Sequence, residues 1–140
     1  MKKMILAALS VLFFVACANN TGGGNQVQAQ NSARESLKAE VNLVNSQLAN
    51  QKIDYMTTML SCELNGNDII YKYSIDESYL TMDELESTRK ATMKSNIEDT
   101  WRNNPQMTIT KSNLNAIGGK VYYKYYGNRS GKTMVIVINP

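Results

Sequence analysis

The 140-residue chain contains no histidine and only two cysteines. Without histidine, the Ser-His-Asp and Cys-His arrangements that activate an enzyme nucleophile cannot form. A zinc site of the usual Cys/His kind is excluded for the same reason. Two cysteines are also too few for a scaffold held together by several disulfides. The lack of histidine and the low number of cysteines therefore exclude several large classes of enzyme and a scaffold built on several disulfides.

Acidic residues are absent from the last part of the chain. Residues 101–140 contain six Lys/Arg and no Asp/Glu, whereas residues 18–100 contain seven Lys/Arg and twelve Asp/Glu, a net charge of −5. An acidic first part is thus joined to a basic last part. This is not the charge distribution of a uniformly basic nucleic-acid binder, so we expect no nucleic-acid partner.

The amino-terminal segment has the pattern of a secretory signal peptide. Lys2 and Lys3 give a positive start, and an apolar run follows over residues 5–16. The run is too short to span a bilayer, which takes about 20 apolar residues in a helix. We therefore expect residues 1–16 to be removed on export.

The end of this segment, Phe14-Val15-Ala16-Cys17, resembles the lipobox of bacterial lipoproteins. It departs from that pattern at Phe14, where the lipobox usually has leucine. The resemblance implies cleavage before Cys17, a diacylglyceryl thioether on its sulfur, and a fatty acyl chain such as palmitate on the new amino end. Several acyl chains anchor a protein stably, because each buried methylene contributes about 0.8 kcal/mol. The alternative is a plain signal peptide cut near Ala16 or Ala18, with Cys17 incidental.

The resemblance also implies a location. Residue 18 is Ala rather than Asp. By analogy with lipoprotein sorting in enteric bacteria, this favours the outer membrane if the source is Gram-negative. We therefore expect a cell-envelope protein that is lipid-anchored through Cys17. Residues 17–31 are rich in Gly, Asn and Gln and predict a flexible tether, and residues 32–140 are expected to form a single domain.

The first part of that domain reads as a helix and a hairpin. Ser32 and Glu35 have the spacing of a capping box, which places the start of the helix at Ser32. Apolar residues alternate along residues 55–64 and 68–76, and Asn65-Gly66 between them favours a type I′ turn. With this turn Cys62 would face Ile69 across the hairpin.

The second part reads as another helix followed by three strands. Thr81 and Glu84 form a second capping box, and the helix is expected to end at residues 103–105. The remaining expected segments are a strand over residues 107–112, a loop over 113–119, a strand over 120–126, a turn over 127–131 and a strand over 132–138.

The element order is helix-strand-strand-helix-strand-strand-strand. It predicts an α+β fold with one antiparallel sheet and both helices on one face. A faint internal repeat has an offset of 52 residues, which places Gly66 on Gly118 and Tyr71-Lys72-Tyr73 on Tyr123-Lys124-Tyr125. A tandem helix-hairpin duplication is one interpretation of this pattern, although the matches are few.

No catalytic constellation stands out, and we expect the protein not to be an enzyme. A Ser-Lys pair is not excluded by the sequence, but nothing selects one. Cys62 lies on the apolar side of its expected strand, which is typical of a small buried residue rather than a reactive thiol. The acidic groups at residues 76–77 and 83–86 lack the loop spacing of a Ca²⁺ site. We therefore expect neither a metal nor a cofactor.

The last hairpin is the best candidate for a binding surface, because cationic and tyrosine side chains alternate along it. The candidate residues are Lys120, Tyr122, Lys124 and Tyr126 on one strand face, with Arg129 and Lys132 at the turn. Lys and Arg side chains beside Tyr rings suit anionic or sugar-like partners and are also typical of protein interfaces. The plainer interpretation is a solvated sheet face on which Lys discourages edge-to-edge pairing.

Three classes of function fit these patterns. The first is a lipid-anchored, non-catalytic binding module that acts as an assembly helper, an inhibitor or a scaffold. The second is a recogniser of anionic polymers or lipid headgroups through the basic hairpin, and the third is an enzyme that uses carboxylates or Ser-Lys chemistry. We favour the first class. The expected partners are then membrane lipid through the acylated Cys17 and an envelope protein or an anionic polymer.

Overall fold

A computed structural model of the chain describes residues 26–140. The signal peptide, Cys17 and the first part of the expected tether lie outside the described residues. The elements in chain order are α1 (Gln26–Leu48), β1 (Thr57–Asn65), β2 (Asp68–Ile75), α2 (Met82–Glu84), η2 (Leu85–Arg89), α3 (Lys90–Asn103), η3 (Pro105–Met107), α4 (Thr108–Ile117), β3 (Val121–Gly127) and β4 (Thr133–Ile138).

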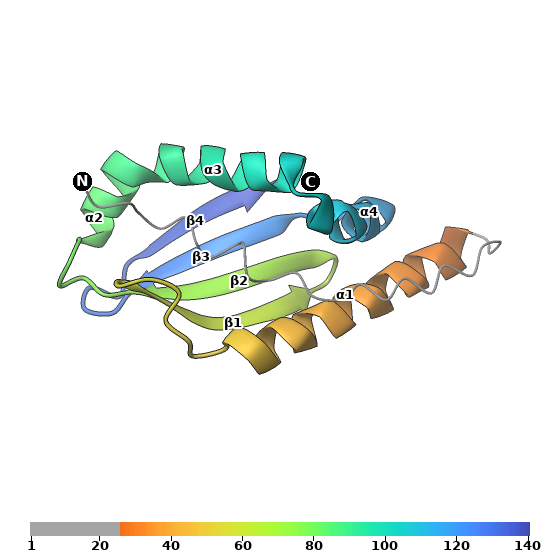
Figure 1. Cartoon of the computed structure of the whole chain (residues 1–140), viewed down its shortest axis with the longest axis horizontal. Helices are drawn as coiled ribbons and strands as arrows, with labels where there is room; N and C mark the ends of the chain where they lie inside the picture. Colours follow the sequence, from red (N-terminus) through yellow and green to blue (C-terminus); the bar gives the residue numbers. More distant parts are fainter. Residues whose placement is uncertain (1–25) are drawn as a thin grey trace.

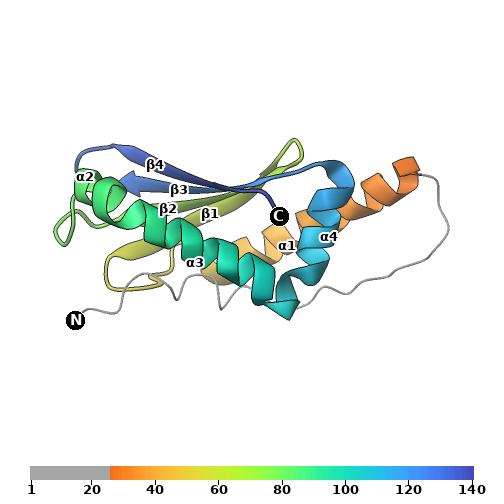
Figure 2. The ribbon, with the colours of Figure 1, turned by 90° about the horizontal axis from the view of Figure 1, so that it is seen from above.

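The described residues form a two-layer structure. One layer is a four-stranded sheet with strand order β1-β2-β3-β4 (Figure 1). The helices α1, α3 and α4 all lie on one side of it, as Figure 2 shows. The α+β class, with one sheet and its helices on one face, is thereby confirmed.

The expectation of a wholly antiparallel sheet is wrong at its centre. The outer pairs β1–β2 and β3–β4 are antiparallel hairpins, but β2 and β3 are parallel. A parallel pair needs a long crossover connection rather than a tight turn. The chain between β2 and β3 supplies this connection as the helical segments α2 to α4.

Residues 107–112 are helical, so the strand predicted there is wrong. Asn104 accepts a hydrogen bond from the Gln106 N–H and, with Pro105, starts a short 3₁₀ turn that leads into α4. The side chains of Thr110, Leu114 and Ile117 are buried at helical spacing. The helix ends at Gly118, whose φ of 68° lies in the left-handed region that favours glycine.

The hairpin β1–β2 exists, but its predicted register is wrong. The turn residues are Gly66 and Asn67, so Cys62 faces Tyr71 rather than Ile69. A bulge between Met59 and Ser61 shifts the register again. The Asn67 Nδ2 donates to the Ile117 carbonyl oxygen at 2.9 Å, and its Oδ1 accepts from Arg34 at 3.0 Å. These contacts to α4 and α1 favour a turn centred one residue later than the sequence predicted.

Helix α1 includes residues that were assigned to the tether. It runs from Gln26 among the described residues, so the predicted start at Ser32 is wrong and residues 26–31 are helical. Ala33 lies in the buried face together with Leu37, Val41 and Val44. The Gln and Ala residues before Ser32 are strong helix formers and extend the helix beyond its packed part.

The capping box at the start of the second helical segment is confirmed. The Thr81 Oγ1 accepts a hydrogen bond from the Glu84 N–H, and the Glu84 carboxylate accepts one from the Thr81 N–H. The π-helical turn η2 then places Leu85 on the same buried side as Met93, Ile97 and Trp101. This turn explains why the apolar spacing of the segment departs from a regular helical repeat.

The 52-residue offset of the sequence repeat is the register of the parallel pair β2–β3. Tyr71 pairs with Tyr123, Lys72 with Lys124 and Tyr73 with Tyr125. Two similar segments thus lie side by side at the centre of the sheet. The repeat therefore has a structural meaning, because matching residues in the two strands share one face.

Candidate binding surface

Strand β3 has two chemically different faces, as its alternating pattern predicted. Val121, Tyr123 and Tyr125 are buried on the helix side, whereas Tyr122 and Tyr126 are only partly buried. Within residues 26–140 no helix covers this second side (Figure 2). We call it the open face of the sheet.

The open face combines residues from β2, β3 and β4. The parallel register brings Ile70, Lys72 and Ser74 of β2 beside the open-face residues of β3. The antiparallel register adds Thr133, Val135 and Val137 of β4 on the other side. The result is a surface with an apolar flank, a tyrosine stripe and lysines.

The lysines of the open face differ in their partners. The Lys72 Nζ lies 3.0 Å from the Glu63 Oε1 of the neighbouring strand. Within residues 26–140, Lys120 and Lys124 form no ion pair. These two side chains therefore keep their positive charge available for an anionic group of a partner.

The structure separates the other two candidate residues from this surface. The Lys132 Nζ donates to the Asp83 Oδ1 at 2.8 Å and to its Oδ2 at 2.6 Å, at the start of the helical layer. These hydrogen bonds to the Asp83 carboxylate, together with its negative charge, raise the pKa of Lys132. Arg129 is exposed at the hairpin turn. The predicted set of six thus divides into four open-face residues and two residues at the turn.

Glu77 holds this turn in place, a role that the sequence reading missed. Its carboxylate accepts hydrogen bonds from the Ser130 N–H at 2.6 Å, the Ser130 hydroxyl at 2.8 Å and the Arg129 N–H at 2.8 Å. These bonds, the one from the Ser130 N–H first, lower the pKa of Glu77 to about 2. A methyl carbon added at Gly127 would lie 2.6 Å from the Glu77 Oε2 and 2.5 Å from the Met82 Cγ, so a larger residue there would displace the Glu77 carboxylate from the turn.

The acidic residues that were weighed as calcium ligands have other partners. Asp76 accepts hydrogen bonds from the Ser78 N–H and hydroxyl at 3.0 and 2.7 Å, and these bonds lower its pKa. Asp83 pairs with Lys132, and Glu84 is part of the capping box. Across residues 26–140 no group of three or more Cys, Asp or Glu side chains is arranged to hold a metal ion.

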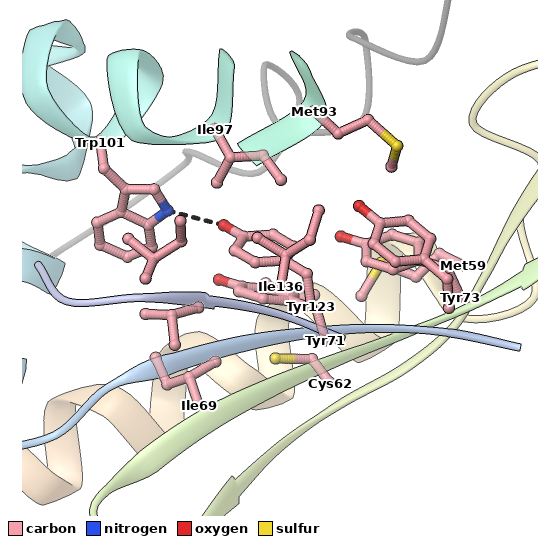
Figure 3. Packing of buried hydrophobic residues seen from close by; sticks show 14 of the residues in the cluster. Met59, Cys62, Ile69, Tyr71, Tyr73, Met93, Ile97, Trp101, Tyr123 and Ile136 are labelled. Atoms are coloured by element: carbon pink, nitrogen blue, oxygen red, sulfur yellow. Dashed lines mark hydrogen bonds between the residues drawn. The ribbon is translucent and has the colours of Figure 1, made fainter. Parts of the chain in front are cut away.

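A buried tyrosine ladder lies directly beneath the open face. The rings of Tyr71 and Tyr123 stack with their centroids 5.1 Å apart, and so do those of Tyr73 and Tyr125. The Trp101 Nε1 donates to the Tyr123 hydroxyl at 2.7 Å (Figure 3). Burial raises the pKa of these four tyrosines. The ladder is a stacked, buried layer between the helices and the open face.

Cys62 is part of the same packed layer. Its side chain is buried and free of any disulfide. Burial raises the pKa of the Cys62 thiol, with smaller contributions from the charges of Glu40 and Glu63. The Asn45 side chain also binds both the backbone N–H and the carbonyl oxygen of Cys62 at 2.7 Å. A protonated, enclosed thiol is unsuited to nucleophilic chemistry.

Glu40 is the other carboxylate with an unusual environment. Burial raises its pKa, while a hydrogen bond from the Thr110 hydroxyl at 2.8 Å lowers it. Asn113 and Ser36 form a further hydrogen bond between the same two helices at 3.0 Å. Glu40 therefore connects α1 to α4 in the packing of the helical layer.

No protein-family model matches the chain, and no curated protein sequence matches it. Two solved structures resemble its fold. One is a Pseudomonas aeruginosa protein that is thought to be secreted, with a TM-score of 0.64 and 12% identity, covering 84% of this chain and 96% of that one. The other is EpsS, the pilotin of the Vibrio vulnificus type 2 secretion system, with a TM-score of 0.58 and 7% identity, covering 81% and 93%. At these identities the likeness shows the fold.

None of the helices in residues 26–140 has the length and apolar character needed to cross a membrane.

Proposed function

We propose that this protein is a lipid-anchored, non-catalytic component of the cell envelope that binds another envelope protein through the open face of its sheet. The observation that carries the proposal is the contrast between the two sides of one sheet. Three helices cover one side, while the other presents Tyr122, Tyr126 and two lysines that have no ion pair among the described residues. Tyr side chains are typical of interface hot spots.

The fold comparisons and the sequence support parts of this proposal. One structural neighbour is a pilotin from a type 2 secretion system, and the other is thought to be secreted. This likeness supports a partner that is itself part of an envelope assembly. The lipobox resemblance at residues 14–17 supports an acylated Cys17 as the anchor. A protein partner on the open face and a lipid at Cys17 require no catalytic residues.

The proposal can be tested by cross-linking tagged full-length protein in intact cells. The test variant is Tyr122→Ser with Lys124→Glu, and the control is Lys52→Glu, a charge reversal at an exposed lysine outside the open face. We expect one stoichiometric partner with the wild type and the control and loss of that partner with the test variant. Recovery of the same partner in equal amount with the test variant would contradict the proposal.

A second candidate function is binding to anionic polymers or lipid headgroups. It is favoured by the absence of Asp/Glu in residues 101–140 and by the lack of ion pairs at Lys120 and Lys124 within the described part of the chain. Such binding fades as salt screens the charges. Sedimentation with vesicles containing phosphatidylglycerol, at about 50 mM and about 500 mM salt, measures this dependence. Vesicle binding by a Cys17→Ser chain that Lys124→Glu abolishes would support this candidate over the first.

A further inference from the structure

At the outer edge of the sheet, some backbone groups of β4 have no hydrogen-bond partner among residues 26–140. The Gly127 N–H donates to the Lys132 carbonyl oxygen at 2.9 Å, which fixes the pairing of β3 with β4. In an antiparallel pair the backbone groups of alternate residues point to the partner strand. Lys132 and every second residue after it therefore point their backbone groups towards β3. The backbone groups of the residues between them, Thr133, Val135 and Val137, point away from the sheet. Among residues 26–140 no backbone hydrogen bond is formed to them.

The opposite edge of the sheet, at β1, is covered. The Met59 N–H donates to the Gln51 carbonyl oxygen at 2.9 Å, and the Met59 carbonyl oxygen accepts from the Asn50 N–H at 2.7 Å. Further along, the Asn45 side chain binds both backbone groups of Cys62. Within residues 26–140 the chain therefore satisfies the outward backbone groups of Met59 and Cys62 at one edge of the sheet, whereas those of Thr133, Val135 and Val137 at the other edge have no partner.

The β4 edge lacks the usual protection against pairing. Natural edge strands carry inward-pointing charges, proline or bulges that prevent other strands from adding to them. Residues 133–138 are Thr-Met-Val-Ile-Val-Ile, without a charge or a proline, and their register with β3 is regular. Such a strand is suited to pairing with an added strand.

The position of α3 indicates what can occupy this edge. In Figure 1 α3 lies past β4, outside the strands, and Figure 2 shows it on the helix side of the sheet. An added strand would thus have α3 beneath it. A second copy that paired β4 with β4 in one continuous sheet would bring both α3 helices to the same side, each projecting towards the other. A single extended segment brings no helix and avoids this conflict.

We infer that the β4 edge accepts one extended, proline-free segment of the protein partner, with apolar side chains towards α3 and acidic side chains on the open face. This inference rests on the proposed function. The acidic preference follows from Lys124, which pairs with Val135 in the register and has no ion pair of its own among the described residues. An acidic side chain opposite Val135 would lie on the same face as Lys124.

A synthetic seven-residue peptide in which valine alternates with glutamate is a suitable probe. Its binding to the full-length chain in detergent can be followed by fluorescence anisotropy. Val135→Pro removes an outward N–H without removing a bond to β3, and Val135→Thr is the matched control that keeps this N–H. We expect Val135→Pro to weaken binding about tenfold or more, because a hydrogen bond is lost and the ring obstructs the added strand. Val135→Thr should change binding by less than about threefold.

N-methylated peptides keep the inference testable if Val135→Pro fails to fold. In an antiparallel pair the glutamate N–H groups of the probe face β4, because residues directly opposite each other share a face. Methylating the glutamate amides should abolish binding, and methylating the valine amides should leave it intact. The reverse pattern would support a parallel strand at the same edge. Equal binding of both methylated peptides, or no binding of the parent peptide, would overturn the inference.

The charge preference has its own test. Lys124→Gln should weaken binding of the glutamate peptide. It should not weaken binding of a peptide that has glutamine in place of glutamate. The cell experiment separates this inference from the proposed function. If Tyr122→Ser with Lys124→Glu loses the envelope partner while the unmodified peptide does not bind, the edge inference fails and the open-face proposal stands. If the peptide binds but no partner is found in cells, the proposed function fails.

Discussion

Tyr122 and Tyr123 are neighbours on one strand, yet they have opposite roles. Tyr123 is fully buried, stacks on Tyr71 and accepts a hydrogen bond from Trp101. Tyr122 lies on the open face and is only partly buried. The same residue type stabilises the fold on one side and is available to a partner on the other. The difference teaches that the position of the helices, rather than residue type, determines which tyrosines are functional candidates.

The largest expected effect comes from removing the buried ring. Tyr123→Ala should lower the free energy of unfolding by about 3–5 kcal/mol, because it removes a large aromatic side chain from a packed core. Urea unfolding followed by circular dichroism measures this loss. Tyr123→Phe is the control that keeps the ring, and it should cost less because it removes only the hydroxyl that accepts from Trp101. Tyr122→Ala is the matched change on the open face. An equally small loss of stability for both variants would contradict the contrast between the buried and the open-face tyrosine.

The buried hydrogen bond gives the next effect. Trp101→Phe leaves the buried Tyr123 hydroxyl without its donor and should cost about 1–3 kcal/mol. The double variant Trp101→Phe with Tyr123→Phe removes both polar partners and should recover part of that loss. A thermodynamic cycle of the four proteins gives the coupling energy. Strict additivity of the two single changes would show that the bond does not stabilise the fold.

The pH dependence of stability tests the role of Glu77 in the hairpin turn between β3 and β4. Its pKa is lowered to about 2, against about 4.3 for an unfolded Glu. A lowered folded pKa gives stability that is present above the unfolded value and is lost as the pH falls through the folded one. Stability should therefore decline from about pH 5 towards about pH 2, and Glu77→Gln should flatten this decline. Measurement of the free energy of unfolding across this pH range checks the prediction. Glu35→Gln, at an exposed residue, is the control.

The smallest effect is expected on the open face. Tyr122→Ser with Lys124→Glu should change the free energy of unfolding by no more than about 1 kcal/mol, because both side chains lie on the uncovered side. The same urea experiment measures it. This result would make the partner test in cells interpretable, since loss of binding could not then be attributed to unfolding. A loss as large as that for Tyr123→Ala would instead show that the open face is part of the core.

The sequence predicted some elements and missed others for identifiable reasons. Alternation along β3 and the capping box at Thr81 are local signals, and the structure confirms both. The region after Asn104 carried both a strand-like alternation and a helical spacing. Packing of α4 against α1, through Thr110 and Glu40, agrees with the helix. The turn at Gly66 moved by one residue because Asn67 binds groups on distant helices.

The candidate site was predicted in part. The four open-face residues follow from a period of two along a strand, which needs no knowledge of neighbours. The engagement of Lys132 by Asp83, and the role of Glu77, depend on residues about fifty positions apart that only the folded chain brings together.

The sequence by itself determined the α+β class, the two-sided chemistry of β3 and the lipobox resemblance at Cys17, because each is written in local spacing and composition. Tertiary structure alone decided the parallel pairing of β2 with β3, since the 52-residue repeat acquires a meaning only when the helical crossover places the two strands side by side. It also decided which edge of the sheet is covered. Residues 45–51 fold back onto β1, whereas no described segment forms backbone hydrogen bonds with the outer side of β4. The unpaired backbone of β4 is a consequence of topology, because strand order, rather than residue type, places it last in the sheet.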